Sequence, residues 1–557
     1  MCRVWVNVLV LSLAMLFGSG QSLAQSRGKA EVFVGPAGDD LIVTIALDRK
    51  TDRLVLDRAD VVRSDSIKLE TPGLTFADDT ISGEKPFDRV TFRLAEDVTE
   101  RDAQYPPFYR VGPGRMLYAP TIYPDPEHWT VSLSPVGFSQ DWISWPTKTE
   151  PTGYLYLGPR SSLVEEAGVR FVFDGTGDAV FEARIRETVL RSLGYLQEVF
   201  GSPPAASPFV ATSILPADQR FSIGDVTSSA MIALRFFGKA PDPTAPDALA
   251  STRSIILHEG VHFWNGGVAH FAQGSPQWMH EGGAEYLATL GSYQLGWTDR
   301  TELAAKLGSW FDRCSTSLSY SDEVALNDLK SLNSSLRYSC GPLLHTLIEL
   351  YQAERSNAPI VAEGWRNLVR TAAADDGTYD LDDFVEAFGG SELLDRPALK
   401  AILATGGQER WQIVLDEMQR MGVKIDLETS PPLRARTALM HLIRSQCTQL
   451  GEGQGYGFYS GQASYRLDTP EGCGVLSGGP TIETLAGFPV TQLSAENYVS
   501  LQALCEGGEV VTFGAADGKT IPVPCTAPLG DAATKPSVSA LPDIAAFSRP
   551  DEKKGAP

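Results

Sequence analysis

Apolar and polar residues alternate along much of the first part of the chain. The segments 41–47, 53–62, 89–95 and 129–136 are rich in β-branched and aromatic residues, and glycine, proline and aspartate separate them. Alternation with a period of two is typical of strands that bury one face. The pattern predicts a β-rich N-terminal domain over residues 25–175.

The spacing of apolar residues changes to every third or fourth position in the next part of the chain. This spacing predicts a helix over 177–201, which ends at a glycine followed by Ser-Pro-Pro. Two apolar runs, 208–215 and 228–237, then predict strands. Helical spacing resumes downstream. We therefore expect an α/β domain over 176–299, continued by a helical part over 300–430.

The C-terminal part has a different composition. Residues 431–540 are rich in glycine and contain four cysteines between short apolar runs, which predicts a small Cys-containing β domain. The polar end of the chain, 541–557, predicts a disordered tail. The predicted fold class is therefore a multidomain α+β protein.

The N-terminus has the composition of an export signal. Arg3 precedes an apolar run over 4–17 that is too short to span a bilayer, and small residues lead to an expected cleavage after Ala24. Cys2 lies before the apolar run, which argues against a lipoprotein signal. Residues 1–24 are predicted to be a signal peptide, with a retained membrane anchor as the alternative. We expect an exported protein, periplasmic or secreted, with no integral membrane segment after signal cleavage.

Six cysteines remain after the expected cleavage, and an even number in an exported chain favours disulfides. Pairing between neighbours in the sequence is the simplest arrangement: Cys314 with Cys340, Cys447 with Cys473, and Cys505 with Cys525.

The formal net charge is −22, and no cluster of lysine and arginine offsets it. A chain of this charge is a poor partner for nucleic acid, whose binding depends on neutralising phosphates. The charge alone identifies no substrate.

A candidate metal site begins in a segment with helical spacing. His258 and His262 stand four residues apart, so both lie on one face of a helix and can direct a ring nitrogen at one ion. Glu259 is offset around the helix, where it can take a proton from water beside the metal rather than bind it. The alternative is a pair of histidines that only pack or cap.

The following predicted helix supplies the third ligand. Glu281 comes after 18 intervening residues, and two histidines with one carboxylate form a common catalytic zinc set. Glu285 lies four residues later on the same face and can accept the second ring N–H of a ligand histidine. We expect one Zn²⁺ per chain, bound by His258, His262 and Glu281.

These motifs resemble those of a known group of enzymes. His-Glu-x-x-His, 18 residues, and then Glu281 within Trp-x-x-Glu-Gly-x-Ala-Glu-Tyr is similar to the gluzincin metallopeptidases of the aminopeptidase N and glycyl aminopeptidase families. The match is specific over 258–286 and looser over 177–430. The resemblance implies a thermolysin-like catalytic domain, zinc, Glu259 as general base, and a peptide or protein substrate.

The resemblance also implies a catalytic tyrosine. Members of these families carry a Tyr-x-x-Gly step that opens a helix downstream of the glutamate ligand, and Tyr338 with Gly341 matches it. A phenol at this position would donate a hydrogen bond to the tetrahedral oxyanion. The alternative is a tyrosine that packs at the start of a helix.

One family motif is missing. Aminopeptidases of this group hold the substrate amine with a glutamate in a Gly-x-Met-Glu-Asn strand, but here Met231 is followed by Ile-Ala. Asp225 and Asp218 are the acids nearest this stretch, and aspartate has a shorter reach. The choice between exopeptidase and endopeptidase therefore stays open.

Three functions are consistent with the sequence. The leading interpretation is an exported zinc metallopeptidase that uses zinc-activated water and a glutamate base. The second is a catalytically silent gluzincin-like binding protein. The third is a zinc hydrolase that acts on a non-peptide substrate.

Overall fold

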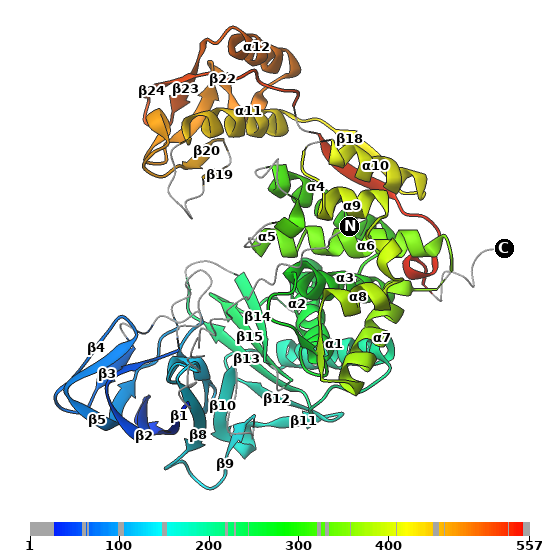
Figure 1. Ribbon diagram of the computed structural model, residues 1–557. Helices are drawn as coiled ribbons and strands as arrows, with labels where there is room; N and C mark the ends of the chain where they lie inside the picture. The colour runs from blue at the N-terminus through cyan, green and yellow to red at the C-terminus, as the bar shows by residue number, and fades with distance from the viewer. Residues whose placement is uncertain are drawn as a thin grey trace, which may run out of the picture. The chain divides into compact units, whose positions relative to one another are not determined.

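The structure is a computed structural model that divides into two compact units, Met1–Leu163 and Val164–Pro557 (Figure 1). It describes residues 27–549 except for these gaps: 58–62, 64–65, 99–104, 147–152, 218–220, 228–229, 243, 320–324, 329–333, 357, 408, 449–455, 462 and 533. The predicted signal peptide, 1–24, lies outside the described residues. No helix in the described ranges combines the length and apolar character needed to cross a membrane.

The first unit contains two β-sheets. One sheet has the strand order β3-β5-β2-β1-β8, with β4 paired to β5, and the other has the order β6-β7-β10-β9. Pairing is antiparallel except between β1 and β8, which are parallel. The strands are β1 (Gly28–Ala37), β2 (Asp40–Val55), β3 (Ile67–Leu69), β4 (Leu74–Ala77), β5 (Thr80–Leu94), β6 (Phe108–Val111), β7 (Gly114–Tyr118), β8 (Trp129–Pro135), β9 (Trp142–Trp145) and β10 (Tyr154–Pro159).

The period-two pattern places one face of these strands in a shared core. Leu41, Val43 and Ile45 of β2 are fully buried, whereas the residues between them are only partly buried. Leu117 and Leu155 from the second sheet join the same apolar cluster. The prediction of a β-rich N-terminal part is confirmed.

The second unit is built on a five-stranded sheet with the order β11-β12-β13-β15-β14. β12, β13 and β15 are parallel, and β14 is an antiparallel edge strand. The strands are β11 (Val164–Glu166), β12 (Val169–Phe173), β13 (Phe209–Leu215), β14 (Phe221–Thr227) and β15 (Met231–Phe237). Every residue of β15 is buried, as expected for a strand that carries neighbours on both edges.

Helices α1 to α10 share one continuous apolar core with this sheet. Asp178 caps the first helix by accepting a hydrogen bond from the Phe181 amide at 2.6 Å. Left-handed Gly201 ends it, and this end is the one that the sequence predicts. The helices are α1 (Ala179–Phe200), α2 (Pro246–Asn265), α3 (Gln277–Gln294), α4 (Arg300–Ser319), α5 (Ser334–Arg337), α6 (Cys340–Ala353), α7 (Ile360–Ala374), α8 (Leu381–Ala387), α9 (Pro397–Leu403) and α10 (Arg410–Arg420). A short parallel pair, β16 (His270–Phe271) and β17 (Thr378–Tyr379), joins two of their loops.

The glycine-rich C-terminal part contains a sheet with the order β19-β20-β21-β23-β24, with β22 paired to β21. It also contains two helices, α11 (Pro431–Gln446) and α12 (Ala495–Glu506), which the prediction of a small β domain did not include. The strands are β19 (Gly457–Ser460), β20 (Tyr465–Asp468), β21 (Thr481–Leu485), β22 (Phe488–Pro489), β23 (Val510–Ala515) and β24 (Thr520–Pro524). Their core is separate from that of the helices above.

Three disulfides join the cysteines in the predicted neighbour pairing: Cys314–Cys340, Cys447–Cys473 and Cys505–Cys525. The first links α4 to the start of α6. The other two lie in the C-terminal part and contribute to its core.

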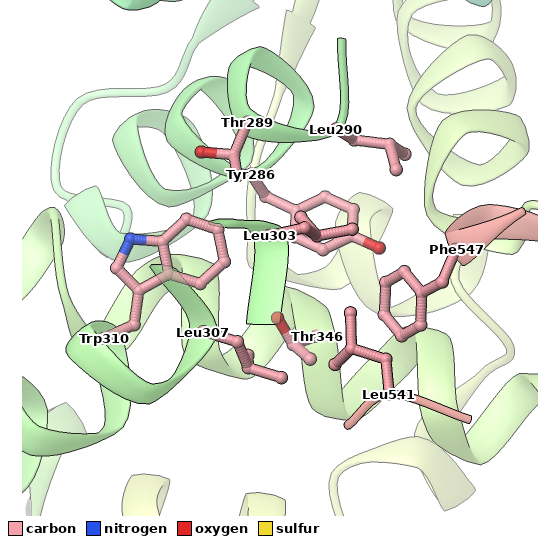
Figure 2. Close-up of a pocket in the computed structure, with 9 residues that line it drawn as sticks. All are labelled: Tyr286, Thr289, Leu290, Leu303, Leu307, Trp310, Thr346, Leu541 and Phe547. Carbon is pink, nitrogen blue, oxygen red and sulfur yellow. The ribbon is translucent and has the colours of Figure 1, made fainter. Parts of the chain in front are cut away.

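The chain then returns to the helices. β25 (Lys535–Ala540) pairs with β18 (Lys424–Glu428), and the Phe547 carbonyl accepts hydrogen bonds from Tyr293 and Arg300. Leu541 and Phe547 line a small apolar cavity together with residues of α3, α4 and α6 (Figure 2). Residues 541–549, which the sequence places in a disordered tail, therefore pack on the helical core. Residues 550–557 lie outside the described part.

Candidate metal centre

Helices α2 and α3 bring the three predicted ligands together. The Nε2 atoms of His258 and His262 are 3.3 Å apart, and Glu281 Oε2 lies 3.3 Å from the first and 3.5 Å from the second. Both histidines are 7% exposed. The helical spacing of four residues and the packing of α2 on α3 thus place three donor atoms around one point.

The arrangement of these donor atoms fits a zinc ion. Ligand atoms at the usual zinc distances in a tetrahedral site are about 3.3 Å from one another. The three separations here, 3.3 to 3.5 Å, match that spacing without rearrangement. Two imidazoles and one carboxylate are also the donor set that zinc accepts in hydrolytic sites. His258, His262 and Glu281 could therefore hold the metal.

Glu259 lies beside this cluster, between α2 and the edge strand β14. A Cβ added to Gly224 of that strand would lie 2.9 Å from Glu259 Cγ, so the glycine leaves the space that the glutamate side chain occupies. Burial raises the pKa of Glu259 to about 7, although the neighbouring histidines oppose the shift. The predicted base is thus placed next to the candidate ligands, but it is not one of the three converging groups.

His258 faces an acidic group on its far side, at ion-pair distance. Its Nδ1 lies 3.4 Å from Glu285 Oε2, and Lys306 of α4 contacts the other Glu285 oxygen at 2.8 Å. Burial lowers the pKa of His258, but hydrogen bonds to Glu281 and Glu285 outweigh this effect and raise it to about 10. Burial raises the pKa of Glu285, yet His258 and Lys306 lower it to about 2. The predicted partner Glu285 is in contact with its histidine, and Lys306 extends the chain of contacts.

His262 is bonded on its far side by a neutral group. Its Nδ1 lies 2.9 Å from Asn265 Oδ1, and the Asn265 amide nitrogen donates to the His280 carbonyl at 3.2 Å. The His280 ring stacks on His262 with centroids 4.5 Å apart. Asn265 was not among the predicted site residues, although its position one turn after His262 is a signal that the sequence contains.

Tyr338 stands in the turn between α5 and α6. Its ring centroid is 5.6 Å from that of His258, and 38% of the residue is exposed. Partial burial and the negative charge of Glu281 raise its pKa, so the phenol keeps its proton at neutral pH. The guanidinium of Arg337 lies 5.2 Å from the ring centroid. The predicted tyrosine is therefore adjacent to the candidate ligands.

The remaining histidines lie in varied surroundings. His270 is exposed and its Nδ1 donates to the Gly266 carbonyl at 2.8 Å, while His345 is fully buried and donates to the Gly341 carbonyl. His128 and His441 are also outside the cluster, with partners Asp125 and the Ala527 carbonyl.

Comparison with solved structures finds similar proteins, and one of them is similar over nearly the whole chain. It is an aminopeptidase N family protein from Idiomarina loihiensis, with 15% identity and a TM-score of 0.54, and the match covers 95% of this chain and 100% of the other. The two chains share a fold. A yeast LTA4 hydrolase in complex with bestatin has 12% identity and a TM-score of 0.40, with 76% and 72% of the chains covered. No protein-family model and no curated protein sequence matches the chain.

The sequence did not reveal the contacts that come from distant parts of this fold. Lys306 reaches Glu285 from α4, and Tyr379 reaches the His262 region from β17. Neither residue belongs to a motif, so only the fold brings them to the site.

Proposed function

We propose that the protein is a zinc-dependent metallopeptidase that hydrolyses peptide bonds. The observation that carries the proposal is the convergence of His258, His262 and Glu281 within 3.3 to 3.5 Å, with Glu259 and Tyr338 beside them. A purely structural metal site would need neither of the last two residues. The aminopeptidase N fold of the similar structure supports the same class of reaction.

In this proposal His258 Nε2, His262 Nε2 and Glu281 Oε2 would hold one zinc ion per chain. Zinc held there would supply Lewis acidity toward water and toward the substrate carbonyl. Glu285 and Asn265 keep the two imidazoles in place through their Nδ1 atoms.

Glu259 is the general base and then the general acid. Its carboxylate takes a proton from the attacking water while the water oxygen bonds to the peptide carbonyl carbon. The carboxylic acid then gives that proton to the amide nitrogen as the carbon–nitrogen bond breaks. Glu259 thus gives up the proton that it took from water, and its carboxylate is ionised again at the end of each turnover.

Tyr338 stabilises the oxygen that becomes negative during this step. Its phenol retains a proton, because partial burial and Glu281 raise its pKa, and can donate a hydrogen bond to that oxygen. The Cys314–Cys340 disulfide fixes the start of α6 two residues after Tyr338 and limits the movement of this turn.

We propose that cleavage does not depend on a free substrate amine. The acid nearest the missing Gly-x-Met-Glu-Asn motif, Asp225 of β14, forms an ion pair with Arg235 of β15 at 2.6 Å. An acid that is already neutralised by a guanidinium is a poor anchor for an ammonium group. Asp218 lies outside the described residues. This pairing favours an endopeptidase.

Export is a further part of the proposal. Three disulfides are typical of proteins that fold in oxidising compartments such as the periplasm or the extracellular space. The expected partners are peptide or protein substrates in that compartment.

The test is hydrolysis of a mixed peptide library by the zinc-loaded protein, with Glu259→Gln as the variant and Glu363→Gln, exposed on α7, as the matched control. We expect cleavage by the wild type and the control, and a fall of about 100-fold or more in kcat for Glu259→Gln with zinc retained. Full activity of Glu259→Gln would contradict the assignment. Zinc binding without any cleavage would favour the binding-protein or non-peptide alternatives.

A further inference from the structure

Two backbone carbonyls lie behind the candidate ligand His262, and they determine where several protons reside. Asn265 and Tyr379 are fully buried, and His280 is partly buried. A backbone carbonyl can only accept a hydrogen bond, so each one fixes the direction of the bond that it receives.

The first carbonyl belongs to Asn265. The Tyr379 hydroxyl lies 3.0 Å from it and must donate to it. A phenol has one proton, so the same hydroxyl is the acceptor in its 2.8 Å contact with His280 Nδ1. His280 therefore carries a proton on Nδ1.

The second carbonyl belongs to His280. The Asn265 side-chain nitrogen donates to it at 3.2 Å, which fixes the orientation of the amide. The oxygen of that amide then faces His262 Nδ1 at 2.9 Å and can only accept. His262 therefore carries its proton on Nδ1, and its Nε2 presents a lone pair toward His258 and Glu281.

Stacking of aromatic rings also fixes the position of His280 beside His262. The His280 ring lies between His262, at 4.5 Å, and Phe271, at 5.1 Å, measured between ring centroids. Phe271 belongs to β16, which pairs with β17, the strand that carries Tyr379. The hydrogen-bonded residues and the strand pair therefore form one connected support for His262.

Among the described residues, the other candidate ligand histidine, His258, contacts a charged group instead of a neutral one. His258 Nδ1 faces the carboxylate of Glu285, whose second oxygen contacts Lys306. Of the two candidate ligand histidines, His262 is the one that contacts a neutral network whose proton positions are set by backbone carbonyls.

We propose that Tyr379 and His280 are positioning residues that act through Asn265 to hold His262 as the Nδ1-protonated tautomer, with Nε2 open to zinc. The proposal rests on the zinc site of the proposed function and does not require that the substrate be a peptide. Loss of the Tyr379 hydroxyl removes the group that orders both the Asn265 carbonyl and His280 Nδ1. The result should be a weaker zinc site rather than an unfolded protein.

The test uses the full chain with Tyr379→Phe. The matched control is Tyr351→Phe, another buried tyrosine whose hydroxyl bonds to Glu417 and the Ala398 amide outside the site. Zinc affinity is measured by competition with a chelator, and thermal unfolding of the zinc-free proteins reports folding. We expect zinc binding about 10 to 100-fold weaker for Tyr379→Phe and unchanged for Tyr351→Phe.

A second measurement reports the tautomer directly. Nitrogen-15 spectra of the histidine rings should show His262 protonated at Nδ1 in the wild type and faster exchange of this proton in Tyr379→Phe. Asn265→Ala should show the same two effects. Unchanged zinc affinity and an unchanged His262 signal in both variants would overturn the proposal.

The outcomes also separate this proposal from the proposed function. A wild-type protein that binds zinc but cleaves no peptide would contradict only the peptidase assignment. A folded wild type that binds no zinc would overturn the positioning role together with the zinc site.

Discussion

Gly282 and Gly341 meet backbone to backbone. A Cβ built on Gly282 would lie 2.4 Å from Gly341 Cα, and one built on Gly341 would lie 2.6 Å from Gly282 Cα. Gly282 follows the candidate ligand Glu281 on α3, and Gly341 lies three residues after Tyr338 on α6. The contact therefore sets the separation between the ligand helix and the helix that follows the candidate catalytic tyrosine.

Gly282→Ala should disrupt this contact. The added methyl group meets backbone rather than a flexible side chain, so α3 and α6 must move apart, at a cost of about 1–3 kcal/mol or more in the free energy of unfolding. We expect lower stability in chemical denaturation and at least a tenfold loss of hydrolysis. Gly194→Ala is the control, because a Cβ there meets nothing within 4 Å on α1. The free energy of unfolding of this control should equal that of the wild type or be slightly higher. Equal behaviour of the two variants would show that the close approach is unimportant.

Tyr338→Phe should affect the chemical step. Removal of one oxyanion donor lowers kcat by about 100 to 1,000-fold in comparable sites. We expect such a fall in kcat, a small change in KM and unchanged zinc content, because the hydroxyl is not one of the three converging donors. Tyr459→Phe, at a residue that is 65% exposed, is the control. If Tyr338→Phe kept the wild-type kcat, the catalytic role would be contradicted and the tyrosine would have only a packing role.

His345 should make the stability depend on pH. The side chain is fully buried, and burial lowers its pKa to about 4. The unfolded chain, with a pKa of about 6.5, binds a proton in a range where the native state does not. The contribution of His345 to the free energy of unfolding is therefore fully present above pH 6.5. It is lost as the pH falls toward 4, by about 3 kcal/mol in total.

His345→Phe should flatten this dependence, since phenylalanine does not titrate and suits the surrounding aromatic rings of Trp365, Phe384 and Phe388. The measurement is urea unfolding between pH 4 and 8 with excess chelator, so that zinc loss does not contribute. His441→Phe, at a partly exposed position outside this core, should keep the wild-type slope. An identical slope in His345→Phe would contradict the prediction.

Much of the candidate site could be predicted because local periodicity encodes it. The spacing of His258 and His262 fixes their common helix face, and the periodic segment around Glu281 predicts the partner helix. Lys306 and Tyr379 could not be predicted, since their contacts depend on how α4 and the β16–β17 pair pack on the ligand helices. The Ser-Pro step at 275–276 predicts an N-cap at Ser275 and a helix that begins at Pro276, whereas α3 begins one residue later, at Gln277.

The fold shows the same division between local and long-range information. Alternation predicted strands such as β2 and β8, and helical spacing with a terminal glycine predicted α1. The packing of 541–549 escaped prediction, although five of these nine residues are apolar, because the apolar run is short and the mostly polar residues 548–557 follow it. Leu541 and Phe547 are buried, and they line a cavity together with residues of α3, α4 and α6 (Figure 2).

The most direct test of the central claim is the zinc content of the purified, folded protein. Elemental analysis of the wild type and of Glu281→Gln, with Glu363→Gln as an exposed control, measures whether His258, His262 and Glu281 form a zinc site. We predict about one zinc per chain for the wild type and the control, and a clear loss in Glu281→Gln. A folded wild type without zinc, or full zinc content in Glu281→Gln, would contradict the account.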